Sequence, residues 1–344
     1  MRLVLILVVF VSAVAGAAPD GAELFAKHCA VCHGDKGGGG VGTPLALPSF
    51  LDSVDDDFLR KTIRLGRPGR VMPAFARLSD AQLDALVGHI RGWSGESAPE
   101  FSSTPVKGDI KHGKELFASH CAGCHGASGE GGHGTGVTFS RRRDLPIIAP
   151  ALNNAGFLAA ATDEMMRHTL IYGREGTPMT SMLVQGLSEQ DIDDVVAYVR
   201  SFENSHLPDK DAAPVAHEPV IEIESPYTLE ETVENLKQSI AGENFLLIRT
   251  DYLEHGLVEE GKENRQEVIL HFCNFSFLFK ALAVDPRVGL FLPCRVTVVE
   301  RDGKVVVSTL NPLYLSSMFN NAELNEYCRE MSQVYQALIE DATL

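Results

Sequence analysis

Two short stretches of the sequence combine paired cysteines with a histidine, a set of side chains that can bind a haem covalently. The stretches are Cys29-Ala-Val-Cys32-His33 and Cys121-Ala-Gly-Cys124-His125. Two thiols three positions apart on a helical turn can form thioether bonds to the two vinyl groups of one haem, and the next histidine then ligates the iron. One such pattern could be a chance match or a redox dithiol. Two of them, 92 positions apart (121 minus 29), predict two covalently bound haem c groups.

The opposite side of each iron needs a second axial ligand, and haem electron carriers commonly use a methionine there, which raises the potential. In residues 34–95 the one methionine is Met72, at the end of the run Gly-Arg-Pro-Gly-Arg-Val-Met. The second half has a matching run, Gly-Arg-Glu-Gly-Thr-Pro-Met, that ends at Met179. We therefore expect His33 with Met72 at one iron and His125 with Met179 at the other. The second half offers further candidates: Met165 and Met166 on an expected helix over 163–172, Met182, His133 and His168.

The segments around the two motifs also repeat, which indicates two similar domains. Gly-Ala-Glu-Leu-Phe-Ala-Lys-His precedes the first motif and Gly-Lys-Glu-Leu-Phe-Ala-Ser-His precedes the second. Each half ends in an expected helix whose N-cap is a serine, Ser79 or Ser188, followed by apolar residues at helical spacing. The methionines are 107 positions apart and the cysteines 92, so the second half carries a 15-residue insertion. We place the basic run 140–144 in this insertion, as a docking site for an acidic partner, a solvated loop or a partner for haem propionates.

With these motifs, each half resembles a class I cytochrome c domain. The resemblance covers residues 20–95 and 108–204, within domains that we place at 19–95 and 104–204. It rests on the Cys-x-x-Cys-His motif, the Gly-Arg run before the methionine, and the closing helix. It implies a small all-helical fold around each haem, with one haem edge exposed for electron transfer. It therefore implies two all-α domains in the N-terminal part of the chain.

Residues 1–18 have the pattern of a signal peptide. Arg2 is followed by an apolar stretch from Leu3 to Val14 and then by small residues suited to cleavage. The stretch is short for a membrane span, so we expect cleavage and export to the periplasm, with an uncleaved membrane anchor as the alternative. The formal net charge of -16 argues against nucleic acid as a partner, because phosphate binding requires a surplus of Lys and Arg.

The remainder of the chain differs from the two halves. Residues 205–219 are polar and rich in proline, which indicates a linker. Residues 220–344 alternate between helix-like and strand-like segments. We expect helices over 228–241, 275–284 and 322–340, strands over 245–249, 267–272, 294–300 and 305–310, and a hairpin turn at 301–304. This mixture indicates an α+β domain with an antiparallel sheet.

The same segment resembles the family known as domain of unknown function 302. The matching stretches are Glu-Val-Ile-Leu-His-Phe-Cys-Asn (267–274), Asp-Pro-Arg-Val-Gly (285–289) and Leu-Pro-Cys-Arg-Val (292–296). The resemblance implies a compact α+β unit that could form a homodimer, and it carries no implied activity. Cys273, Cys294 and Cys328 are expected to be structural, as one disulfide with a spare thiol or as buried thiols. The alternative is a reactive thiol, or a metal site that includes His271 on the strand face of Cys273.

Three functions are compatible with these features. The leading hypothesis is an exported dihaem c-type cytochrome that transfers single electrons between redox proteins, such as a dehydrogenase, another cytochrome or a terminal oxidase. The first alternative is a haem-linked oxidoreductase whose C-terminal domain converts a small substrate, such as an inorganic sulfur compound, at Cys294. The second alternative is a redox or ligand sensor that the C-terminal domain reads out. A methionine at the expected place in both halves favours the electron carrier over the enzyme.

Overall fold

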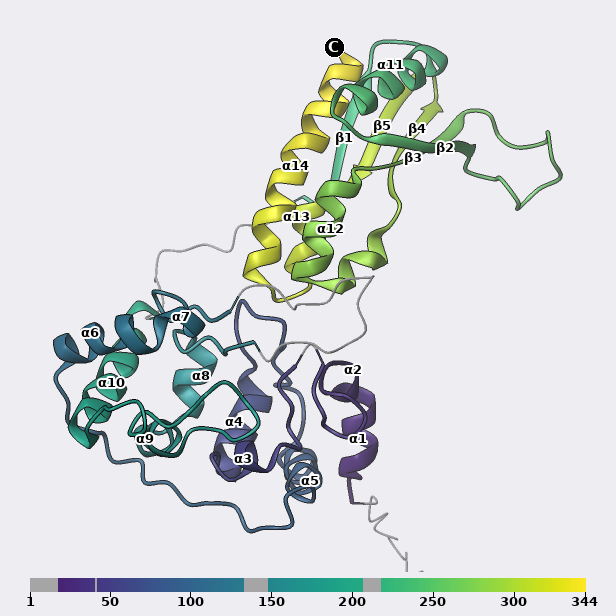
Figure 1. The fold of residues 1–344 in the computed structure, drawn as a ribbon. Helices are drawn as coiled ribbons and strands as arrows, with labels where there is room; N and C mark the ends of the chain where they lie inside the picture. Colours follow the sequence, from purple (N-terminus) through teal and green to yellow (C-terminus); the bar gives the residue numbers. More distant parts are fainter. Residues whose placement is uncertain (1–17, 41, 133–147, 207–217) are drawn as a thin grey trace, which may run out of the picture.

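The computed structural model describes residues 18–40, 42–132, 148–206 and 218–344, which are drawn in colour in Figure 1. Residues 1–17, His133, the basic run 140–144 and most of the expected linker lie outside the described residues. The structure has two helical parts followed by a part that contains a sheet. None of the helices in the described ranges combines the length and the apolar character that a membrane span requires.

The first helical part has five described helices around the first cysteine motif. They are α1 (Gly21–His28), α2 (Ala30–His33), α3 (Pro48–Leu51), α4 (Asp56–Leu65) and α5 (Asp80–Arg91). Helix α5 begins at a capping box, in which Ser79 and Gln82 exchange hydrogen bonds between side chain and backbone, as predicted. Its apolar residues Leu83 and Leu86 are fully buried and share one core with Phe25 of α1.

The second helical part repeats this arrangement around the second motif. Its elements are α6 (Ile110–His120), α7 (Ala122–His125), α8 (Ala155–Ala160), α9 (Asp163–Tyr172), α10 (Glu189–Ser201) and the 3-10 helix η1 (Phe202–His206). Helix α9 has the predicted bounds, and α10 begins at the predicted cap, where Ser188 pairs with Asp191. The two parts share a continuous core, because Phe157 of α8 packs against Phe58 of α4 with ring centroids 6.4 Å apart.

In each helical part the first helix crosses the last at a glycine. A Cβ atom built on Gly21 of α1 would lie 2.0 Å from the carbonyl oxygen of Ala85 in α5. A Cβ atom on Gly113 of α6 would lie 1.9 Å from the carbonyl oxygen of Asp194 in α10. The glycine that opens each repeated segment is therefore required by the close approach of two helix backbones.

The C-terminal part is an α+β domain with an antiparallel sheet, as predicted, and the sheet has five strands where the sequence predicts four. Strands β1 (Val220–Ser225), β2 (Leu246–Tyr252), β3 (Glu267–Cys273), β4 (Cys294–Arg301) and β5 (Lys304–Leu310) lie in the order β1-β5-β4-β3-β2. Its helices are α11 (Leu229–Gly242), α12 (Phe275–Val284), the 3-10 helix η2 (Pro286–Phe291), α13 (Pro312–Ser317) and α14 (Ala322–Thr343). Helices α11 and α14 cover one face of the sheet (Figure 1), where Leu236 and Leu338 are buried with Val298 and Val307.

The sequence patterns did not predict β1 or α13. Strand β1 directly follows the proline-rich segment and carries two glutamates, Glu222 and Glu224, on its exposed side. It becomes a strand through its pairing with β5, which runs from Val220 opposite Leu310 to Ser225 opposite Val305. Helix α13 is only six residues long, which is too short to produce a clear helical period.

Candidate haem-binding sites

Both cysteine motifs form the same tight turn where one helix ends and a short helix begins. In each motif the carbonyl oxygen of the first cysteine accepts hydrogen bonds from the N–H groups of the second cysteine and the histidine. These N–O distances are 3.1 and 2.9 Å at Cys29, and again 3.1 and 2.9 Å at Cys121. Burial raises the pKa of both of these thiols to about 11, with a smaller contribution from the second cysteine of each motif. The two motifs therefore present two thiols and an imidazole in the same geometry.

The histidines of the motifs are oriented by hydrogen bonds to backbone carbonyl groups. Nδ1 of His33 donates to the carbonyl oxygen of Thr43 at 2.8 Å, and Nδ1 of His125 donates to that of Pro150 at 2.9 Å. Burial lowers the pKa of both imidazoles, although these hydrogen bonds act in the opposite direction. A neutral imidazole whose Nδ1 carries the proton leaves Nε2 free to ligate iron. A Cβ atom on Gly42 would lie 2.6 Å from the His33 ring, so glycine is needed there.

The two candidate methionines lie at corresponding ends of two similar loops. Each loop starts at a glycine with positive φ that ends the preceding helix, Gly66 (64°) after α4 and Gly173 (70°) after α9. In each loop the arginine that follows this glycine donates its backbone N–H to the methionine carbonyl, at 3.0 Å for Met72 and 2.6 Å for Met179. Both methionine side chains are partly buried. The structure thus places Met72 and Met179 in equivalent positions.

The other candidate ligands of the second half have packing roles. Three are buried core methionines: Met165, Met166 and Met182. His168 packs against the ring of Tyr172, with centroids 4.6 Å apart. This arrangement favours Met179 over these four residues, and His133 lies outside the described residues.

Two arginines, Arg67 and Arg174, follow the loop glycines and reach across the interface between the helical parts. The guanidinium carbon of Arg67 lies 5.8 Å from the ring centroid of Phe157, and that of Arg174 lies 5.3 Å from the ring centroid of Phe50. Each guanidinium also donates to an oxygen of the other part, at 3.2 and 3.0 Å respectively. The two phenylalanines are 107 positions apart, as are the two arginines. The interface therefore pairs equivalent residues of the two repeats.

The chemistry of these residues fits a bound haem at each site. Burial lowers the pKa of Arg67 and Arg174 to about 10, so both side chains stay positive at neutral pH. Within the described residues, neither is ion-paired with a carboxylate. A largely buried charge is costly unless a counter-ion balances it, and haem propionates carry the required charge. The Gly-Arg pair repeated in both loops is the sequence signal for these arginines, although the pair alone does not predict a role for them.

The three C-terminal cysteines meet at one apolar cavity of about 100 Å³. Cys273, Cys294 and Cys328 all line it, and none of these three cysteines forms a disulfide. Burial raises the pKa of Cys273 and Cys328 to about 11 and also raises that of Cys294. His271 does not line this cavity, and its Nε2 lies 3.5 Å from Oδ2 of Asp251. The cavity therefore contains protonated thiols rather than thiolates.

In the described part of the chain, one group of three side chains has atoms close enough to hold a metal ion: His112, Asp191 and Asp194. Nδ1 of His112 lies 2.8 Å from Oδ2 of Asp194, which joins α6 to α10. The hydrogen bond to Asp194 raises the pKa of His112. The contact between the two helices explains why these three side chains lie close together. None of the C-terminal cysteines belongs to this group.

Comparisons with known families cover most of the chain. Residues 16–90 match the family described as "Cytochrome C oxidase, cbb3-type, subunit III", and residues 110–203 match the family "Cytochrome c". Residues 221–342 match "Domain of unknown function DUF302". A solved structure described as an uncharacterized conserved protein DUF302 from Bacillus stearothermophilus is 24% identical, with a TM-score of 0.34. It covers 37% of this chain and 99% of that chain.

Curated relatives match up to about half of this chain. The "Cbb3-type cytochrome c oxidase subunit CcoP" of Rhodobacter capsulatus is 30% identical over 200 residues, which are 53% of this chain and 61% of that protein. The "Dihydro-heme d1 dehydrogenase" of Pseudomonas aeruginosa is 43% identical over 77 residues, which are 22% of this chain and 15% of that protein. The chain spans about half the length of the first curated relatives it matches.

The paired motifs, the helical folds around them and these matches define the class of the two helical parts, which are cytochrome c domains. Such domains bind haem c covalently. In this chain, two cytochrome c domains are joined to a C-terminal domain of the DUF302 family.

Proposed function

We propose that the chain is an exported dihaem cytochrome that passes single electrons between protein partners in the periplasm. The observation that carries this proposal is the repetition of one complete site. Each helical part has the same cysteine turn, an imidazole oriented through Nδ1, a methionine at the end of an equivalent loop and a partly buried arginine. Two equivalent sites that share one core suit a chain that receives an electron at one site and releases it at the other.

The proposed haem attachment uses Cys29 and Cys32 in the first domain, and Cys121 and Cys124 in the second. The proposed axial ligands are His33 with Met72, and His125 with Met179. When bound, each haem supplies an iron that alternates between the ferrous and ferric states. The two cysteines, the histidine and the methionine of each site would hold that group, and a methionine sulfur ligand would favour the ferrous state and raise the potential.

The proposed partners follow from the relatives. The CcoP protein of Rhodobacter capsulatus is described as a subunit of a cbb3-type cytochrome c oxidase. We propose a terminal oxidase complex as one partner, with a dehydrogenase or another cytochrome as the electron donor. Export depends on residues 1–18, and retention of that segment would anchor the chain to the membrane.

Carbon monoxide tests this proposal because it binds reduced haem iron only where a protein ligand is missing or weakly held. The haem-loaded, fully reduced protein should show no spectral change on addition of carbon monoxide. Met72→Ala and Met179→Ala should each open one iron, so that each variant responds in about half of its haem. Met182→Leu is the matched control, since a Met-to-Leu change conserves volume and should leave both irons closed.

Other outcomes would contradict the proposal. A response in the wild-type protein would mean that at least one iron lacks a firm second axial ligand, which a simple carrier requires. If Met182→Leu responds to carbon monoxide and Met179→Ala does not, the ligand of the second haem is Met182 and not Met179. Optical spectra of the oxidised and reduced protein give the number of haems per chain, and a value other than two would contradict the dihaem assignment.

A haem-linked oxidoreductase is the second candidate, because Cys273, Cys294 and Cys328 converge on one cavity. A thiol that handles substrate must be present as thiolate. With a pKa of about 11, roughly one Cys273 or Cys328 side chain in 10⁴ is deprotonated at pH 7. The cavity therefore favours structural cysteines, and the electron carrier remains the better-supported function.

A further inference from the structure

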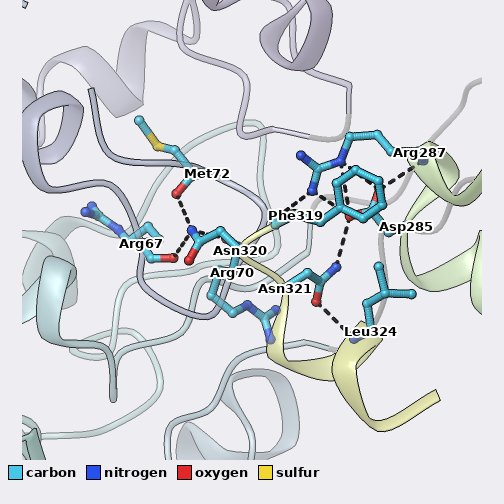
Figure 2. Close-up of polar contacts among 9 residues, drawn as sticks. All are labelled: Arg67, Arg70, Met72, Asp285, Arg287, Phe319, Asn320, Asn321 and Leu324. Carbon is cyan, nitrogen blue, oxygen red and sulfur yellow. Dashed lines mark hydrogen bonds and ion pairs between the residues drawn. The ribbon is translucent and has the colours of Figure 1, made fainter. Parts of the chain in front are cut away.

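We infer that the C-terminal domain positions Met72, through Asn320, and thereby sets the ligation and potential of the first haem. Figure 2 shows Asn320 inserted among the backbone groups of the Met72 loop. Its side-chain nitrogen donates to three carbonyl oxygens of the loop: those of Arg67 (3.1 Å), Arg70 (2.6 Å) and Met72 (3.0 Å). The inference rests on the proposed role of Met72 as an axial ligand.

Two more hydrogen bonds tie the loop to the same segment of the C-terminal domain. The backbone N–H of Gly69 donates to Oδ1 of Asn320 at 3.0 Å. The backbone N–H of Ala322, the first residue of α14, donates to the Gly69 carbonyl at 2.7 Å. The loop is thus held on both its N–H and its carbonyl groups by a segment about 250 residues later in the chain.

The equivalent loop of the second domain supplies its own support. The Thr177 hydroxyl donates to the Arg174 carbonyl at 2.8 Å and accepts from the Met179 N–H at 3.1 Å. The residue at the same place in the first loop is Arg70, since 177 minus 107 is 70, and its side chain instead donates to the Gly132 carbonyl at 2.7 Å. Asn320 therefore donates to the Arg67 carbonyl as Thr177 of the second loop donates to the equivalent Arg174 carbonyl.

The segment that carries Asn320 is itself firmly held. The ring of Phe319 is buried and stacks on Phe291 with centroids 5.2 Å apart. Arg287 lies over the Phe319 ring at 4.6 Å and donates to the Phe319 carbonyl at 2.8 Å. The carboxylate of Asp285 is fully buried and pairs with Arg287. These contacts, shown in part in Figure 2, give Asn320 a rigid base in the C-terminal domain.

The structure also explains why an asparagine stands at this position. Asn320 has φ of 49°, in the left-handed region that asparagine and glycine adopt more readily than other residues. Asparagine combines that backbone conformation with a side chain that both donates and accepts. The substitution Asn320→Gly keeps the backbone conformation and removes every side-chain contact with the loop.

The test uses the haem-loaded full-length protein with Asn320→Gly. The matched control is Asn244→Gly, because Asn244 also has positive φ (58°) but is exposed at the end of α11. We expect Asn320→Gly to increase amide exchange in residues 67–72 by at least about tenfold, because four hydrogen bonds are lost and one alone accounts for about a factor of ten. We also expect a lower potential for the first haem, weaker sulfur-to-iron absorption and a carbon monoxide response in up to half of the haem. The second haem should keep its potential in the same molecule.

Three outcomes separate the inference from the proposed function. If Asn320→Gly leaves exchange, potential and absorption equal to those of Asn244→Gly, the inference about Asn320 is wrong. If Met72→Ala opens the first haem while Asn320→Gly changes nothing, only this inference fails and the axial assignment stands. If Met72→Ala leaves both irons closed, the axial assignment fails and the inference fails with it. Asn320→Asp, which keeps the acceptor and loses the donor, should give the same direction of change as Asn320→Gly.

Discussion

The crossing of α6 and α10 permits a quantitative test of how the second cytochrome domain is built. At the crossing, a Cβ atom on Gly113 would lie 1.9 Å from the Asp194 carbonyl oxygen and 3.0 Å from Cβ of Tyr198. The substitution Gly113→Ala places a methyl group there. The helices must then move apart by about 1.5 Å at this point to restore the 3.4 Å of an ordinary contact.

This separation should be costly because the clash is between a methyl group and a backbone atom that cannot rotate away. Overpacking of a close contact typically costs about 1–3 kcal/mol, and a backbone clash belongs at the upper end. The same movement loosens the packing of Phe117 on α6 against Val195 on α10, both of which are almost fully buried. We therefore expect Gly113→Ala to destabilise this domain by about 3 kcal/mol.

Native-state hydrogen exchange is the suitable assay, because a chain of several domains does not unfold in one two-state transition. A loss of about 3 kcal/mol should accelerate exchange of the most protected amides in α6 and α10 about 150-fold. The control is Gly88→Ala on α5, where a Cβ atom would meet no described atom outside its own stretch of helix within 4 Å. The free energy of unfolding of the Gly88→Ala variant should rise by about 0.5–1 kcal/mol, because alanine has a higher helix propensity than glycine. If Gly113→Ala exchanges within a factor of about two of the wild-type protein, the close-packing argument is refuted.

Further predictions concern charge, pH and the thiols. Arg174→Met removes a partly buried positive charge that lowers the pKa of His125. The potential of the second haem should therefore fall by on the order of 50 mV in a redox titration. An unchanged potential would contradict an electrostatic role of Arg174 at this haem. The hydrogen bond to Asp194 raises the pKa of His112 above 6.5 in the folded protein. The stabilisation from this contact is therefore complete below pH 6.5 and is lost as the pH rises through the raised pKa of His112. Protection of α6 should decline over that range in the wild-type protein but not in His112→Gln. Alkylation of Cys273 and Cys328 at pH 7 should be about 300-fold slower than that of a free cysteine of pKa 8.5; fast labelling would revive the oxidoreductase.

The haem chemistry and many helices could be predicted from the sequence because their causes are local. The cysteine motif needs only a spacing of three and an adjacent histidine, and a helical turn then brings these side chains together. The capped helices α5 and α10 could be predicted because Ser79 and Ser188 form capping boxes with residues three positions later. The same holds for the hairpin between β4 and β5, whose turn contains Asp302 and Gly303, both with positive φ.

Features that depend on residues distant in the sequence could not be predicted in this way. Strand β1 is defined by its pairing with β5, about 85 positions later, and not by its own apolar pattern. The apolar run predicts a strand over 245–249, whereas β2 extends to Tyr252 through its pairing with β3. In both cases the partner strand decides the bounds, because ladder hydrogen bonds are made between segments.

The sequence by itself therefore determined the class of chemistry: two cysteine motifs suited to haem attachment, a histidine beside each, a loop that ends in methionine in each repeat and an α+β domain after them. Only the tertiary structure showed that Arg67 and Arg174 cross between the repeats and that Asn320 supports the Met72 loop. These contacts join residues that are 90 to 250 positions apart. No local spacing encodes such contacts, because they form only when separately folded surfaces pack against each other.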